Sequence, residues 1–161
     1  MTDEDKINQL LEEVPACEMA TIGYFGQKTG DAQKKTGFKV ITTSDGYPQS
    51  HIHLIGKGKS VCIKLTKNEY FKHKGYPDSL SQEEAREFNT FLTLPYKYPQ
   101  VFEMGDVKFK VETYWQYAIY QWKLENDGFK DDLKLEVDAD GYVIYPEQPD
   151  YTLLNDVHIE V

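Results

Sequence analysis

The sequence is poor in arginine, in cysteine and in long apolar runs. Arg86 is the only arginine in a chain of 161 residues whose net charge is -9. Nucleic-acid binding needs a cationic surface, and base recognition in the major groove relies heavily on arginine. The composition therefore argues against nucleic acid as the main partner, although a lysine patch could still contact a phosphate.

The other two shortages bear on redox chemistry and on the membrane. Two cysteines, Cys17 and Cys62, are too few for a disulfide framework. No apolar run approaches the ~20 residues that a membrane-spanning helix needs. The N-terminal residues MTDEDK are acidic and do not resemble a secretory signal peptide. We therefore expect a cytoplasmic protein without a membrane segment.

Tyrosine is abundant instead, with twelve residues, and charge is unevenly distributed along the chain. Residues 127–161 contain ten acidic residues and two lysines, a net -8, whereas residues 28–74 contain ten lysines and three acidic residues, a net +7. The length fits one domain. We expect a single domain over residues 1–161, with a helix–sheet–helix core at 1–126 and an acidic hairpin and tail at 127–161.

Hydrophobic periodicity and capping residues predict an α+β fold. We expect an antiparallel sheet of four or more strands, arranged as a meander, packed with about three helices, plus a C-terminal hairpin around Asp140 and Gly141. The helices are expected at residues 3–14, 81–93 and 113–126, and the meander at residues 17–65. Ser81 and Glu84 form a capping-box pattern. Residues 68–74 are expected to form a short helical turn, and residues 94–106, with two prolines, an irregular segment.

Residues 50–65, SHIHLIGKGKSVCIKL, predict a β-hairpin with a defined register. A turn centred on Lys57 and Gly58 places alternate side chains on opposite faces. The apolar face carries Ile52, Leu54, Val61, Ile63 and Leu65. The other face carries His51, His53, Cys62 and Lys64, with His53 directly opposite Cys62.

The histidine-bearing face is the candidate metal site, with His51, His53, Cys62 and His73 as the predicted ligands. Imidazoles at i and i+2 of a strand project the same way, and imidazole and thiolate both bind zinc. Glu69 and His158 are alternatives to His73 as the remaining ligand. The competing interpretation is that both histidines are polar residues on a less buried face and that Cys62 is a small apolar residue.

Residues 136–147, EVDADGYVIYPE, partly match a calcium-binding EF-hand loop. The acidic positions of that frame are Glu136, Asp138, Asp140 and Glu147. Pro146 lies inside the frame and the preceding LKLEV alternates like a strand, so we favour a plain hairpin over a calcium site. The same segment supplies the expected protein-binding residues, which are Tyr142, Tyr145, Asp138, Asp140 and Glu147.

Two stretches resemble a domain-of-unknown-function family of small bacterial and phage proteins. The first is Ser50-His51-Ile52-His53 followed by CIKL at 62–65 and the Glu-rich helix from Ser81. The second is YWQYA at 114–118, followed by Trp122 and by Glu125-Asn126, which is similar to the Trp-rich closing helix of small phage and mobile-element proteins. The resemblance implies no established activity, and it implies an association with mobile elements and toxin–antitoxin neighbourhoods.

Two functions of different classes follow from these observations. The first is a non-enzymatic, acidic protein-interaction module, of phage or mobile-element origin and inhibitor- or antitoxin-like, that binds a partner protein. The alternative is a metal-dependent hydrolase or nuclease with His51 and His53 as metal ligands. We favour the first because no catalytic nucleophile–base pair is visible at a recognisable spacing.

Overall fold

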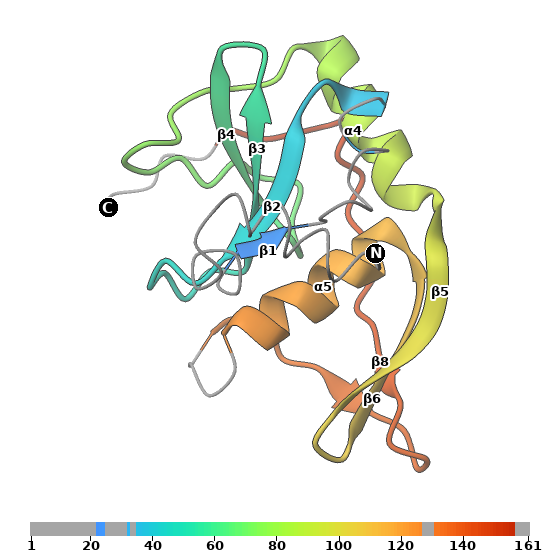
Figure 1. Cartoon of the computed structure of the whole chain (residues 1–161). Helices are drawn as coiled ribbons and strands as arrows, with labels where there is room; N and C mark the ends of the chain where they lie inside the picture. Colours follow the sequence, from blue (N-terminus) through green and yellow to red (C-terminus); the bar gives the residue numbers. More distant parts are fainter. Residues whose placement is uncertain (1–21, 25–31, 33–34, 127–130, 157–161) are drawn as a thin grey trace, which may run out of the picture.

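The computed structural model describes residues 22–24, 32, 35–126 and 131–156 (Figure 1). Its long helices are α4 (Gln82–Thr93) and α5 (Tyr114–Glu125). The strands are β1 (Ile22–Tyr24), β2 (Lys39–Thr43), β3 (His51–Gly56), β4 (Lys59–Lys64), β5 (Pro95–Met104), β6 (Val107–Thr113), β7 (Glu136–Val137) and β8 (Val143–Ile144). The helix predicted at 3–14 lies outside the described residues.

The predicted single sheet of four or more strands is wrong, and of the three predicted helices the described residues contain two, α4 and α5. The described strands divide among separate antiparallel sheets, and the main one has only three full strands, β2, β3 and β4, with the three-residue β1 paired at its edge. The pairs β5–β6 and β7–β8 each form a sheet of their own. The sequence did not predict this division, because the first strand of the β5–β6 sheet lies in a segment that was expected to be irregular.

The prediction of an irregular segment at residues 94–106, based on its two prolines, is wrong, because Pro95–Met104 forms a strand. Proline cannot donate to a strand ladder, but an edge strand tolerates it. Among the described strands β5 pairs only with β6, and its register shifts between Pro95 and Gln100, which accommodates Pro99. The two strands therefore form a long ribbon in spite of the prolines.

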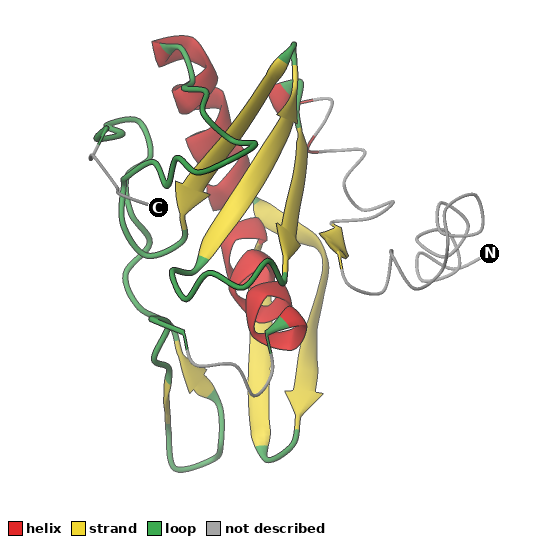
Figure 2. Cartoon of the chain, turned by 90° about the vertical axis from the view of Figure 1, so that its left-hand side faces the viewer, coloured by secondary structure: helices red, strands yellow, loops and turns green. Residues whose placement is uncertain are grey.

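The predicted hairpin register is confirmed. Ile52 pairs with Ile63, and His53 pairs with Cys62. Lys57 and Gly58 have φ of 51° and 72°, as the two central residues of a type I′ turn do. The apolar face of the hairpin belongs to a fully buried core that also contains Phe88 and Phe91 of α4. Figure 2 shows α4 behind this sheet and α5 at its lower end.

Both helices begin with a capping box, formed by Ser81 with Glu84 in α4 and by Thr113 with Gln116 in α5. The Ser81 hydroxyl accepts from Glu84 N, and the Glu84 carboxylate accepts from Ser81 N. The spacing of Trp115, Ala118, Ile119 and Trp122 predicts one buried stripe on α5. α5 is instead buried over most of its circumference, because one side packs on the β2 sheet and another on the β5–β6 ribbon. Its Tyr117 and Tyr120 stack on Tyr96 and Phe102 of the ribbon, with ring centroids 4.6 and 4.3 Å apart.

No helix within the described part of the chain is long and apolar enough to cross a membrane. The cytoplasmic location stays a prediction.

Gly56, at the end of β3, tests how tightly the hairpin packs on its neighbour. A Cβ there would lie 2.5 Å from the backbone oxygen of Gly37. We expect Gly56→Ala to lower the free energy of unfolding by ~1–3 kcal/mol, because backbone must move to make room. Urea denaturation measures this change.

Gly58→Ala is the matched control, since a Cβ at Gly58 meets nothing within 4 Å and only its φ of 72° is unfavourable. That variant should cost ~1 kcal/mol. Equal stability of Gly56→Ala and the unmodified protein would contradict the close approach of β3 to Gly37.

Candidate metal centre

Both faces of the β3–β4 hairpin are interior. His51, His53 and Cys62 are 0%, 1% and 0% exposed. The ring of Phe71 lies 5.2 Å from that of His51, and the ring of Trp122 lies 4.9 Å from it. The interpretation that these histidines occupy a less buried face is therefore wrong.

The segment after β4 brings His73 to the same place. Its chain runs alongside β4, with Ile63 bridged to Tyr70 and with Phe71 N donating to Cys62 O at 2.9 Å. A turn follows, in which Tyr76 N donates to His73 O at 2.8 Å. The short helical turn predicted at 68–74 is wrong, because this segment forms backbone bonds with its neighbours instead.

The four predicted ligands form one cluster. The donor atoms of His51, His53, Cys62 and His73 all lie within 4.8 Å of one another, and all four residues are buried. Glu69, an alternative ligand, instead forms an ion pair with Lys64 at 2.8 Å. His158 lies outside the described residues. We refer to the four clustered residues as the histidine cluster.

Asp45 lies beside the histidine cluster and was not predicted from the sequence. Its Oδ2 lies 2.8 Å from Nε2 of His51, 3.5 Å from Nε2 of His53 and 3.7 Å from Nε2 of His73. The residue comes from the turn that precedes β3. The only signal was its place six residues before His51, within residues 44–48, SDGYP, whose residue types predict a turn.

Hydrogen bonds at Nδ1 decide which imidazole atom faces Asp45. His51 Nδ1 bonds to Gln49 O, and His73 Nδ1 bonds to Phe71 O at 2.8 Å. A carbonyl oxygen only accepts, so Nδ1 carries the proton in both rings, and Nε2 of the neutral ring presents a lone pair. Two lone pairs directed at a carboxylate oxygen repel it unless a proton or a metal cation lies between them.

His53 is the buried histidine without a hydrogen bond. Neither of its ring nitrogens has a hydrogen-bond partner among the described residues. Burial, reinforced by the charge of His51, lowers the pKa of His53 to about 3. The ring is therefore neutral near pH 7, the form that binds metal. An unsatisfied buried polar group costs ~1–3 kcal/mol, which a bond to a metal ion would offset.

Burial acts on the two remaining donors in the same direction. It raises the pKa of the Cys62 thiol, with the charge of Asp45 adding to the effect. Burial also tends to raise the pKa of Asp45, but in the metal-free protein a proton between His51 Nε2 and the carboxylate, with the positive charge that it brings, outweighs burial, and the pKa lies below its usual value. Near neutral pH, Asp45 is a carboxylate and metal-free Cys62 is a thiol.

The spacing of Asp45 and the three imidazoles suits a tetrahedral ion. With zinc–nitrogen bonds of 2.0–2.1 Å, neighbouring ligand atoms of a tetrahedron are ~3.3–3.4 Å apart. The three distances from Asp45 Oδ2, 2.8, 3.5 and 3.7 Å, lie on both sides of that value. These distances are compatible with the binding of this carboxylate oxygen and the three imidazole nitrogens to one ion.

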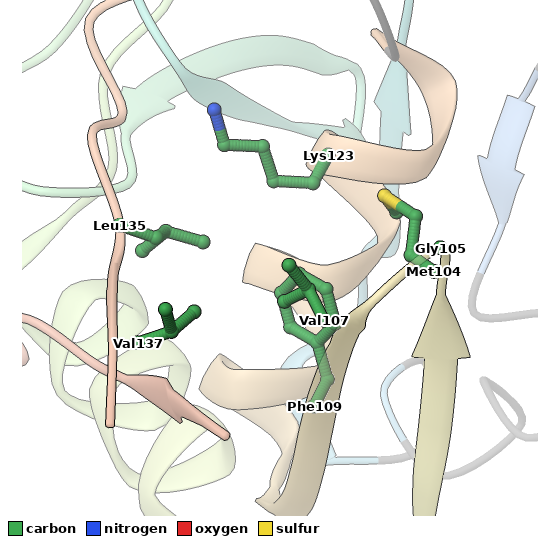
Figure 3. A pocket seen from close by; sticks show the side chains of 7 residues that line it. All are labelled: Met104, Gly105, Val107, Phe109, Lys123, Leu135 and Val137. Carbon is green, nitrogen blue, oxygen red and sulfur yellow. The ribbon is translucent and has the colours of Figure 1, made fainter. Parts of the chain in front are cut away.

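A second candidate site is a mostly apolar cavity away from the histidine cluster (Figure 3). It has a volume of about 390 Å³ and lies between β6, α5 and the chain before β8. It is lined by Met104, Gly105, Val107, Phe109, Lys123, Leu135 and Val137. Lys123, its charged lining residue, is paired with Asp131 at 3.0 Å. None of the predicted ligands reaches this cavity.

The expected protein-binding residues are only partly together. Asp138, Tyr142 and Tyr145 line a hollow of about 510 Å³, whereas Asp140 and Glu147 do not line it. Asp138 Oδ1 accepts from the backbone N of Asp140 and of Tyr142, both at 2.9 Å. The segment forms the β7–β8 hairpin, as favoured over a calcium loop, and residues 145–156 contain no exiting helix.

No family model, curated protein or solved structure matches the chain. The resemblance to a domain-of-unknown-function family stays a prediction. Any assignment of function therefore depends on the geometry of the site.

Because the pKa of His53 is lowered, we expect the free energy of unfolding of the metal-free protein to fall at acidic pH. The unfolded chain takes up a proton on His53 below pH 6.5, whereas the folded protein does so only near pH 3. Stability should therefore be unaffected above pH 6.5 and fall by ~1.4 kcal/mol per pH unit below it. Urea denaturation in the presence of a chelator, at pH 7 and pH 5.5, should show a loss of ~1 kcal/mol.

His53→Gln is the control for this measurement, because the amide keeps much of the volume and does not titrate. Its stability should depend less on pH in the same interval. An identical pH dependence in both proteins would show that His53 is not held neutral.

Proposed function

We propose that this protein binds a divalent transition-metal ion, with zinc as the best match, through His51, His53 and His73. Asp45 or Cys62 completes the ligand set. The observation that carries the proposal is the convergence of three imidazole Nε2 atoms within 3.7 Å of one carboxylate oxygen. Two of those rings are oriented by backbone carbonyls, as second-shell carbonyls commonly orient metal-bound histidines.

The donor types favour zinc over the hard cations. Calcium and magnesium prefer oxygen ligands throughout, whereas this centre has three nitrogens, a thiol and a single carboxylate. Imidazole and thiolate suit zinc and its neighbours in the first transition row. Burial supports the same conclusion, since His53 would otherwise remain an unsatisfied polar group in the interior.

The hydrolase or nuclease function, with His51 and His53 as ligands, stays a prediction. Three histidines with a water in the fourth position are a known catalytic zinc arrangement, in which the ion lowers the pKa of the water to ~7. Such chemistry needs an open or exchangeable position. A centre closed by four protein ligands would instead stabilise the fold.

The protein-binding function also stays a prediction. Its support is the hollow beside Tyr142 and Tyr145, where Val101 is 44% exposed. Tyr145 is already engaged, because its hydroxyl donates to Lys110 O at 3.0 Å. The histidine cluster therefore carries the stronger functional argument.

Metal analysis tests the proposal. The purified protein, incubated with zinc and then desalted, should retain one ion per chain by elemental analysis. His53→Gln should weaken zinc binding at least ~10-fold, because one of three imidazole ligands is lost. We choose glutamine over alanine since His53 is buried and truncation would also leave a cavity.

Asp138→Asn is the control variant, because Asp138 is a turn carboxylate in the β7–β8 hairpin and lies outside the cluster. It should bind zinc like the unmodified protein. Zinc at 100 times its dissociation constant should stabilise both proteins by ~2.7 kcal/mol and should stabilise His53→Gln less. Protein that holds no zinc after this treatment would overturn the proposal.

A further inference from the structure

The donors of the proposed centre differ in their access to solvent. The residues of the histidine cluster are all buried, whereas the side chain of Asp45 is 23% exposed. A molecule arriving from solvent would therefore meet the centre on the side of Asp45.

Asp45 is also held less firmly than the histidines. His51 and His53 lie on β3, which is paired on both sides, with β2 and with β4. Asp45 lies on a surface turn in which residues 44–46 are exposed. Gly46 beside it has φ of 89°, and a Cβ there would meet nothing within 4 Å. Asp45 therefore lies outside the strand pairing that holds His51 and His53.

Charge determines what could replace Asp45. A dication held by three neutral imidazoles in a buried site keeps its full charge, and an uncompensated buried charge is very costly. The Asp45 carboxylate compensates part of it. A ligand that displaces Asp45 must bring its own negative charge and an oxygen donor, and a small carboxylate meets both conditions.

Two partly exposed aromatic rings flank this side of the centre. Tyr76 stacks on His53 with ring centroids 3.9 Å apart and an interplanar angle of 17°. The ring of Tyr47 lies 4.8 Å from that of His73. Apolar faces beside an ion lower the local dielectric constant and so strengthen its attraction for an anion.

We propose that the bound ion has one exchangeable position, which Asp45 occupies at rest and which a carboxylate from solvent can take. This inference rests on the proposed function, since it requires the metal ion. It assigns Asp45, rather than Cys62, as the labile ligand, and it gives a ligand class for the centre: small molecules that carry a carboxylate.

Cobalt replaces zinc as a spectroscopic probe in the test, because its visible absorption reports ligand number and type. Asp45→Ala should bind cobalt ~10-fold more weakly than the unmodified protein. Acetate should restore that affinity and shift the visible bands of the variant toward those of the unmodified protein, whereas chloride at the same ionic strength should not. Asp138→Ala, which removes a different turn carboxylate, should match the unmodified protein in both respects.

Asp45→Asn keeps the shape of the side chain and covers the case in which the alanine variant folds poorly. It too should bind cobalt more weakly and respond to acetate. If both variants have the spectrum of the unmodified protein and ignore acetate, Asp45 is not a ligand; the inference fails and the proposed function stands. If the unmodified protein binds neither cobalt nor zinc, the proposed function fails as well.

Discussion

The backbone pairing of β3 with β4 decides where His51, His53 and Cys62 of the candidate centre lie. Side chains alternate across a strand, so a slip of one residue would exchange the two faces of the hairpin. The isoleucines of the apolar face would then point toward the side where the histidine cluster now lies, and His53 would point into the apolar core. Because both faces are buried, a slip is costly on either side, and the I′ turn at Lys57 and Gly58 further restricts the register.

Burial of the histidine-bearing face is what gives these residues their chemistry. On an exposed strand, imidazoles would be hydrated and would titrate near pH 6.5. Here Tyr76 stacks on His53 while Phe71 and Trp122 pack against His51. His53 has no hydrogen-bond partner among the described residues, and burial lowers its pKa to about 3. Burial also strengthens the repulsion between the imidazole Nε2 lone pairs and the Asp45 carboxylate, unless a proton or a metal cation lies between them.

The tyrosines have a structural explanation that does not involve a partner. α5 lies between the β2 sheet and the β5–β6 ribbon, and tyrosines of the helix and of the ribbon stack on each other. Tyrosine suits such a position because its ring packs while its hydroxyl reaches a polar atom. Sequence patterns predicted one buried stripe on α5 because the ribbon, which contains Pro95 and Pro99, was not recognised as a second packing surface.

Local signals sufficed where a few neighbouring residues decide the structure. The capping boxes at Ser81 and Thr113, the turn at Lys57 and Gly58, and the alternation in 50–65 determined both helix starts and the hairpin register, since each depends on contacts a few residues apart. The division into separate sheets, the burial of the histidine-bearing face and the arrival of His73 and Asp45 depend on packing between distant segments. A sequence pattern specifies a face but not what covers it, so only the tertiary structure could turn His51 and His53 into a centre with five donors.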